Sequence, residues 1–397
     1  MKKTPFFAII VGLCLICFLV SGEYATSITT DKILVLEGGT LIDGTGDAPV
    51  FDAVLIIKNG YITDMGSMKS TEVPEGAMVI PLKGETILPG FINAHIHNGY
   101  NEHNLKTWAF HGVTTVRDLG GDPKNNLFSF RDKALKNPQL ARLIAAGPMI
   151  TVPGGYPKIP WGSPAGLPIT SPDDARDQTI RLLDEGADII KIALESGERF
   201  QREIPVLSLE EAKAIVEVAH RRGTIVSAHV LVAKDLERAL EAGVDDIAHM
   251  VTDDPSDDLI QRVVRQGIYW VPTLELWHGV GYGLGDVAIN NLRRFVMAKG
   301  LVALGTDFDG YNCPFDLGMP IREVRWMKEA GMTPMQIIVA ATKNASRVCN
   351  LEDSIGTLEK GKIADILVVK GDPLDDLEAL LNPRMVIRGG QIIRDEQ

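Results

Sequence analysis

The chain has 397 residues, of which 45% are hydrophobic, 23% charged and 6% aromatic, with 39 glycines and 22 prolines. This composition is ordinary for a soluble globular protein and excludes disorder, collagen and a multi-span membrane protein. The formal net charge is -12. Such a charge repels a phosphate backbone, so we expect no nucleic-acid partner.

The first residues, MKKTPFFAIIVGLCLICFLVSGEYA, combine two lysines, a 15-residue apolar run and small residues after it. This pattern predicts a signal peptide over residues 1–25 and an extracytoplasmic mature protein. The alternative is an uncleaved membrane tether, but the run is shorter than the roughly 20 residues of a spanning helix. We therefore expect no stable membrane insertion after cleavage. Only Cys313 and Cys349 remain beyond this segment, and the sequence leaves open whether they pair.

Both ends of the mature chain have the pattern of short strands. Apolar alternation interrupted by Gly and Asn-Gly runs from Asp31 to about Gly90, and the tail from Gly356 repeats it in ADILVVKGDP and PRMVIRGGQII. Because the two segments share this pattern, we expect residues 26–90 and 355–397 to form one β-sandwich domain together.

The central residues 91–354 alternate apolar runs with amphipathic stretches. Eight runs can be counted, namely TILPGFINAHIH, GVTTVRDLG, RLIAAGPMI, ADIIKIAL, GTIVSAHV, DDIAHM, GIYWVPT and LVALGTDF. Helix signals lie between them, including a capping box that starts at Ser208. Eight such units favour an α/β fold of the (β/α)8 TIM barrel type over an open doubly wound sheet. The first run is also not followed by the G-x-G-x-x-G that a dinucleotide-binding sheet would carry.

Titratable residues lie in these runs or at their ends, where the active site of such a barrel is built. The candidates are His95, His97, Lys191, His229, His249 and Asp307. The two histidines of the first run are two residues apart, so both can point to one ion from a strand. A single histidine is as often structural, but the joint occurrence at matching strand ends indicates a hydrolytic metal site. Imidazole nitrogens suit zinc, and aspartate adds an oxygen that also takes a proton.

Lys191 stands out because isoleucines surround it, and an unpaired ammonium is costly to bury. One interpretation is a lysine paired with an acid of the barrel. The other is carbamylation by CO2, which makes the side chain an anionic ligand that can bridge two divalent ions. Such a pair of ions holds a hydroxide at neutral pH.

These motifs resemble the amidohydrolase superfamily, in particular its imidazolonepropionase-like and prolidase-like branch. GFINAHIHNG is similar to the first-strand metal motif of that family, ADIIKI to its carbamylated-lysine strand, and EAGVDDIAHM and VALGTDF to its sixth and eighth strands. The tail from GMTPMQ onward resembles the last helix and the returning β domain. The resemblance covers essentially the whole mature chain.

The resemblance implies two divalent metal ions, with zinc expected. It places His95, His97 and Asp307 on one ion, His229 and His249 on the other, and a carbamate on Lys191 between them.

The chain departs from the family pattern at three places. Asn93 stands where the family usually has an aspartate, and Tyr156 follows Gly154-Gly155 where dipeptide-cleaving members often have a histidine. Leu231 replaces the second histidine of a common H-x-H after the fifth strand. The last two changes weaken an expectation that a free substrate carboxylate is recognised as in prolidases.

Tyr156, Arg117 and His278 are the candidate substrate contacts. Tyr156 lies in a Gly- and Pro-rich loop over 151–168 that is long enough for a lid. Arg117 could bind an anionic group, with a structural ion pair as the equal alternative. His278 falls in the loop after the seventh run, where a surface histidine is the commoner outcome.

We therefore expect an exported, metal-dependent hydrolase in which Asp307 takes a proton from the attacking hydroxide and passes it to the leaving group. Its expected substrate is a small molecule with an amide bond, of the dipeptide or N-acyl amino acid type. An ester, lactone or cyclic amide is the alternative, and a non-catalytic barrel protein is the alternative from another class. The sequence leaves open whether the chain forms a homo-oligomer.

Overall fold

The computed structural model describes residues 33–121, 126–161, 166–309 and 313–396. The expected signal peptide over 1–25 lies outside the described residues. Residues 32–397 form one compact unit. A search of the described residues for membrane-spanning helices finds none long and apolar enough to cross a bilayer.

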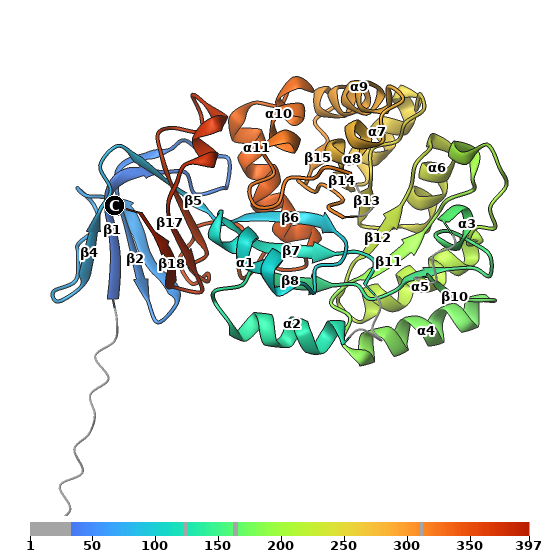
Figure 1. The fold of residues 1–397 in the computed structure, drawn as a ribbon, viewed down its shortest axis with the longest axis horizontal. Coiled ribbons are helices and arrows are strands. Elements are labelled where there is room, and N and C mark those ends of the chain that lie inside the picture. The colour runs from blue at the N-terminus through green and yellow to red at the C-terminus, as the bar shows by residue number, and fades with distance from the viewer. Residues whose placement is uncertain (1–32, 122–125, 162–165, 310–312, 397) are drawn as a thin grey trace, which may run out of the picture. The chain divides into compact units, whose positions relative to one another are not determined.

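Strands from both ends of the chain share one mixed sheet, whose blue and red strands lie side by side in Figure 1. The strand order is β18-β17-β16-β5-β1-β2-β3, with β4 paired to β1. The bounds are β1 Ile33–Leu41, β2 Val50–Lys58, β3 Tyr61–Ser67, β4 Met78–Pro81, β5 Glu85–Pro89, β16 Ile366–Lys370, β17 Pro383–Arg388 and β18 Gln391–Asp395. β5 joins the two ends because it pairs with β1 on one side and β16 on the other. Apolar side chains from both ends, such as Leu55 and Ile366, form one buried cluster.

The central chain forms an α/β fold with two parallel sheets, ordered β6-β7-β8 and β10-β9-β11-β12-β13-β14-β15. The bounds are β6 Phe91–Ile96, β7 Val113–Asp118, β8 Arg142–Ala145, β9 Met149–Thr151, β10 Gly166–Pro168, β11 Ile190–Ala193, β12 Val226–His229, β13 Asp246–Ala248, β14 Tyr269–Val271 and β15 Leu301–Val302. Every neighbouring pair in these two sheets is parallel, so within each sheet the carboxyl ends of the strands face the same way. Apart from β10, the strands also stand in chain order.

Two of the expected apolar runs are each divided between two strands. The first run splits at Gly90 into β5 of the mixed sheet and β6 of the parallel sheet. A Cβ at Gly90 would lie 2.3 Å from Thr114 Oγ1, so this crossing requires glycine. The third run splits at Gly147, whose φ of +73° turns the chain between β8 and β9. Apolar periodicity cannot show either break, because the residues on both sides are buried.

The eighth run forms only the short β15, and the residues after it follow β6 through backbone hydrogen bonds. The amide of Ala94 donates to Leu304 O over 2.8 Å, Asp307 N donates to His95 O over 2.8 Å and His97 N donates to Phe308 O over 2.9 Å. The first and last parallel segments are therefore neighbours, although Asp307 interrupts a regular ladder with a φ of +64°.

Helices follow most of the parallel strands. Their bounds are α1 Glu102–Phe110, α2 Leu127–Lys136, α3 Lys158–Trp161, α4 Pro172–Glu185, α5 Leu209–Arg221, α6 Ala233–Ala242, α7 Asp257–Arg265, α8 Leu274–Val280, α9 Leu284–Met297, α10 Ile321–Glu329, α11 Pro334–Ala341 and α12 Lys343–Val348. The capping box expected at Ser208 is formed, since the Ser208 hydroxyl and the Glu211 carboxylate each accept the other's backbone amide.

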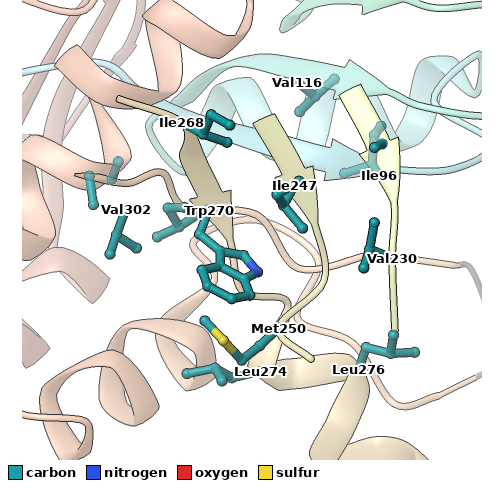
Figure 2. Packing of buried hydrophobic residues seen from close by; sticks show 14 of the residues in the cluster. Ile96, Val116, Val230, Ile247, Met250, Ile268, Trp270, Leu274, Leu276 and Val302 are labelled. Carbon is teal, nitrogen blue, oxygen red and sulfur yellow. The ribbon is translucent and has the colours of Figure 1, made fainter. Parts of the chain in front are cut away.

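The main core is an apolar cluster between the parallel strands and the helices. Figure 2 shows part of it around Trp270, including Ile247 of β13 and Leu274 of α8. The fully buried indole of Trp270 donates its N–H to the carbonyl of His249 over 2.7 Å. Core packing thus fixes the backbone at a candidate ligand.

Candidate metal centre

Asp307 and the two histidines of β6 form the first part of the site. Oδ1 of Asp307 lies 3.1 Å from His95 Nε2 and 3.0 Å from His97 Nε2. Both His95 and Asp307 are buried, whereas His97 keeps about a fifth of its side chain exposed. The H-x-H spacing therefore places both imidazoles against one carboxylate.

The turn that carries Asp307 is tied to β6 by a buried polar network. Asn93 Oδ1 accepts the amides of Thr306 and His95 at 3.2 and 3.3 Å, and Asn93 Nδ2 donates to Thr306 Oγ1 over 2.9 Å. A Cβ on Gly305 would lie 2.8 Å from the His95 amide nitrogen, so only glycine allows this close approach. Asn93, where the family pattern has aspartate, sets the position of Asp307 relative to His95.

His229 ends β12 and His249 follows β13, so neighbouring strands deliver both rings. The centroid of the His249 ring lies 4.7 Å from that of His95 and 4.8 Å from that of His229. His249 has a left-handed φ of +74°, and its Nδ1 lies 3.0 Å from Thr273 Oγ1. The imidazole nitrogen left for an ion is therefore Nε2.

Lys191 lies in β11, next to β12, and only 1% of it is exposed. Burial lowers the pKa of its ammonium to about 7, although the nearby Asp246 and Asp307 oppose this shift. Its Nζ has no hydrogen-bond partner among the described residues. The alternative of a lysine hydrogen-bonded to an acid of the barrel therefore does not describe Lys191 in this structure.

The pKa values of the four histidines separate into two groups. Burial, together with the charge of Lys191, lowers the pKa of His95, His229 and His249 well below the usual range. Burial also acts to lower the pKa of His97, but the Asp307 carboxylate outweighs it and raises that pKa. A divalent cation binds neutral imidazoles and an ionised carboxylate. The lowered pKa values favour the neutral form of these three histidines.

The unpartnered polar atoms of the site test whether the residues fit a metal ion. Both ring nitrogens of His95, both carboxylate oxygens of Asp307 and Nε2 of His229 are buried without a hydrogen bond among the described residues. Ligand atoms of His95, His249 and Asp307 all lie within 4.8 Å of one another. Buried polar atoms without partners are rare and costly. Imidazole nitrogens and a carboxylate are ligands that zinc accepts, so the donor set fits a divalent ion.

The three expected substrate contacts lie in different surroundings. The Tyr156 ring stacks on His229 with centroids 4.0 Å apart, which places it beside the site. The expectation for Arg117 is corrected: its side chain is fully buried and pairs with Asp246 at 2.8 and 3.1 Å, so the structure favours the structural ion pair. His278 stacks on Trp326 of α10 with centroids 4.0 Å apart, which makes it part of helix packing.

Glu195 is a residue of the site that sequence reasoning missed. It lies two residues beyond β11, is 1% exposed, and has Oε2 at 3.9 Å from His229 Nε2. Its Oε1 accepts the amide of Gly197 over 2.7 Å, and burial raises the pKa of Glu195 to about 7. The signal in the sequence was the spacing of two residues from Lys191 to Ala193 and on to Glu195, which continues the alternation of β11 just past its end.

Comparison with known proteins decides the family. The model of the amidohydrolase family matches residues 86–393, which span both parallel sheets and, in the mixed sheet, most of β5, all of β16 and β17 and part of β18. The chain belongs to the amidohydrolase family. The predicted resemblance and the prediction of a hydrolase acting on carbon–nitrogen bonds are therefore confirmed at the level of the family.

Similar proteins align with nearly the whole chain. Ochratoxinase from Aspergillus niger is 25% identical over 433 residues, covering 91% of this chain and 87% of its own length. Imidazolonepropionase from Symbiobacterium thermophilum is 24% identical and covers 85% and 90%. The crystal structure of a putative prolidase from Bifidobacterium longum has a TM-score of 0.76 and 27% identity, covering 91% of this chain and 94% of that one. The likeness thus includes the β region at both chain ends.

Proposed function

We propose that the protein is a metal-dependent hydrolase of an amide bond in a small molecule. The observation that carries the proposal is the convergence of ligand atoms from the buried residues His95, His249 and Asp307 within 4.8 Å of one another. Family membership and relatives named ochratoxinase and prolidase support an amide as the bond cleaved.

We propose two divalent ions, with zinc the expected metal. The residues that would hold them are His95, His97, Lys191, His229, His249 and Asp307. The pKa of about 7 at Lys191 supports carbamylation, because the neutral amine is the form that adds CO2. Its buried and unpartnered Nζ supports the same role.

In the proposed mechanism the side chains of the site move protons and orient the reacting groups. Divalent ions held by these residues would supply a water of lowered pKa and polarise the scissile carbonyl. Asp307 is the proton carrier in this proposal, since its Oδ1 lies within 3.1 Å of the imidazoles of His95 and His97 and the turn at Thr306 fixes its position. It would accept a proton from the attacking water and deliver it to the leaving nitrogen. Tyr156, stacked on His229, would form one wall for the substrate.

A dipeptide or an N-acyl amino acid is the proposed substrate class. Arg117, the arginine expected to bind an anionic substrate group, is buried and paired with Asp246, so it cannot bind a free carboxylate. Tyr156 and Glu195 beside His229 offer a phenol and a carboxyl group instead. These groups favour substrates that present hydrogen-bond donors on this side of the site.

The test combines metal content with a substrate panel. Elemental analysis of the purified protein is expected to give about two divalent ions per chain. Lys191→Ala, grown with the same zinc and bicarbonate, should hold one or none. Turnover of dipeptides and N-acyl amino acids should exceed that of aryl esters and lactones. One ion in both proteins would reject the carbamate bridge, and preferred hydrolysis of esters or lactones would reject the amide assignment.

We also propose the finer points of fold and location. Hydrogen bonds between β6 and residues 304–308 support closure of the parallel strands into a (β/α)8 barrel. The composite sheet supports a β-sandwich domain made from both chain ends. Export is proposed from the leader-like sequence of residues 1–25 alone.

A further inference from the structure

Thr273 is a strained residue in contact with the candidate metal centre. It follows β14 with a φ of +50°, a left-handed conformation that β-branched residues rarely adopt. The side chain is fully buried, and its Oγ1 lies 3.0 Å from His249 Nδ1. A left-handed residue of this kind persists only where the surrounding structure holds it, so the backbone that follows Thr273 must be fixed by another group.

The group that holds this backbone is the carboxylate of Glu323 on α10. Its Oε1 accepts the amide of Leu274 over 3.0 Å, and its Oε2 accepts the amide of Glu275 over 2.7 Å. These are the first two amides of α8, directly after Thr273. One carboxylate therefore fixes both peptide groups that follow the strained residue.

The side chain of Glu323 is fully buried, and among the described residues it makes these two hydrogen bonds and no other. Burying a carboxylate without a neighbouring cation costs free energy. Holding the first amides of α8 with a carboxylate from α10 therefore costs the fold stability. Neighbouring contacts reinforce the link: Arg322 of α10 pairs with Glu275 at 2.8 Å and with Asp316 at 2.9 Å. The Glu275 carboxylate also accepts the Asp316 amide.

We propose that Glu323 is a positioning residue that fixes the tautomer and ring orientation of His249 through Thr273. With Thr273 Oγ1 held in place, Nδ1–H of His249 donates to it and Nε2 keeps its lone pair for a ligand. Partners of this kind are common behind metal-binding histidines, and losing one typically weakens metal binding 10- to 100-fold. The metal-binding part of the inference rests on the proposed function, whereas the tautomer part does not.

Glu323→Gln is the informative variant because the side chain keeps its size. A glutamine oxygen can accept one of the two amides, but its NH2 group would face the other. Thr273→Val removes the hydroxyl and keeps the β-branch. If Glu323 acts through Thr273, the double variant should be no worse than the single variants, because both remove the same link. Asp365→Asn is the matched control, since this buried carboxylate accepts the Gly389 amide over 2.7 Å in the mixed sheet.

The first readout is zinc affinity by competition with a chromophoric chelator, measured on the full chain. We expect Glu323→Gln, Thr273→Val and the double variant to bind zinc about 10- to 100-fold more weakly than the parent. Asp365→Asn should lose stability to denaturant but keep parental affinity. Parental zinc affinity in Glu323→Gln, or losses that multiply in the double variant, would overturn the inference.

The second readout needs no metal. Imidazole 15N shifts of metal-free protein, with the His249 signal assigned by its loss in His249→Gln, report the tautomer directly. We expect the Nδ1–H form in the parent and a mixture of tautomers in Glu323→Gln. An unchanged tautomer would overturn the positioning role even if the parent binds zinc. A parent that binds no zinc but shows the tautomer change would reject the proposed function and keep the positioning role.

Discussion

At the scale of single residues, the site concentrates backbone conformations that side chains normally avoid. His249 and Asp307 have φ values of +74° and +64°, and Thr273 has +50°. Non-glycine residues in this region are uncommon and often mark functional sites, where the surrounding structure must hold them. Here the holders are identifiable: Trp270 and Thr273 bond to His249, and Asn93 bonds to the turn at Thr306. These strained conformations indicate a functional site at this place, and this evidence does not depend on any sequence motif.

Lys191 gives a prediction about pH. Its folded-state pKa of about 7 lies below the ordinary value of 10.5 because burial disfavours the ammonium. Between these values the unfolded chain binds a proton that the folded chain has lost, so the free energy of unfolding rises with pH. The slope approaches about 1.4 kcal/mol per pH unit for one proton. Below pH 7 both states are protonated, and the full cost of burying the cation remains.

The measurement is denaturant unfolding of metal-free protein in CO2-free buffer from pH 6 to pH 10, against Lys191→Met. The variant should be the more stable protein at pH 6, and the difference should shrink as pH rises. Parallel stability curves for the two proteins would show that Lys191 is not a buried, neutralised amine.

At the scale of elements, the order of strands and helices was largely predictable, since apolar periodicity and capping signals are local. The candidate ligands could be found because each stands in or just after an apolar run. The link from Glu323 to His249 could not, because it joins α10 to α8 across 48 residues or more through backbone amides that carry no sequence signal. The burial of Arg117 was equally hidden, since a strand sequence does not show which buried acid lies opposite.

Arg117 carries the prediction at this scale. Its guanidinium on β7 bonds to Asp246 of β13 and to backbone carbonyls of Ala94 and Val348, so it joins β6, β7, β13 and α12. Arg117→Met leaves Asp246 buried without its cation and should cost about 3–5 kcal/mol of unfolding free energy. The double variant Arg117→Met with Asp246→Leu should recover part of this loss. Urea unfolding measures both, and a raised KM at unchanged stability would instead support the substrate contact.

At the scale of the whole molecule, the two chain ends are locked to the central fold by polar as well as apolar contacts. Arg142 at the start of β8 pairs with Asp365, just before β16, at 2.6 Å. The other oxygen of Asp365 accepts the amide of Gly389, which follows β17. The returning tail therefore depends on the parallel sheet for its position, and the sequence patterns of the two ends alone could not show this contact.

The proposed metal ions should stabilise the same global fold. Their ligands come from five separate segments between His95 and Asp307, and the unfolded chain cannot hold these together. Binding to the folded state alone adds about 4 kcal/mol when the free metal concentration is 1,000 times its Kd. Removal of the metal by a chelator should therefore lower Tm, and added Zn2+ should restore it.

In a His95→Ala, Asp307→Ala double variant, the chelator should shift Tm much less, because two ligand groups are gone while the β region is unchanged. Equal chelator shifts in both proteins would place the stabilising ion elsewhere. Elemental analysis should show metal in the parent before treatment. If the chelator then leaves the Tm of the parent unchanged, the bound ion does not hold the five segments together.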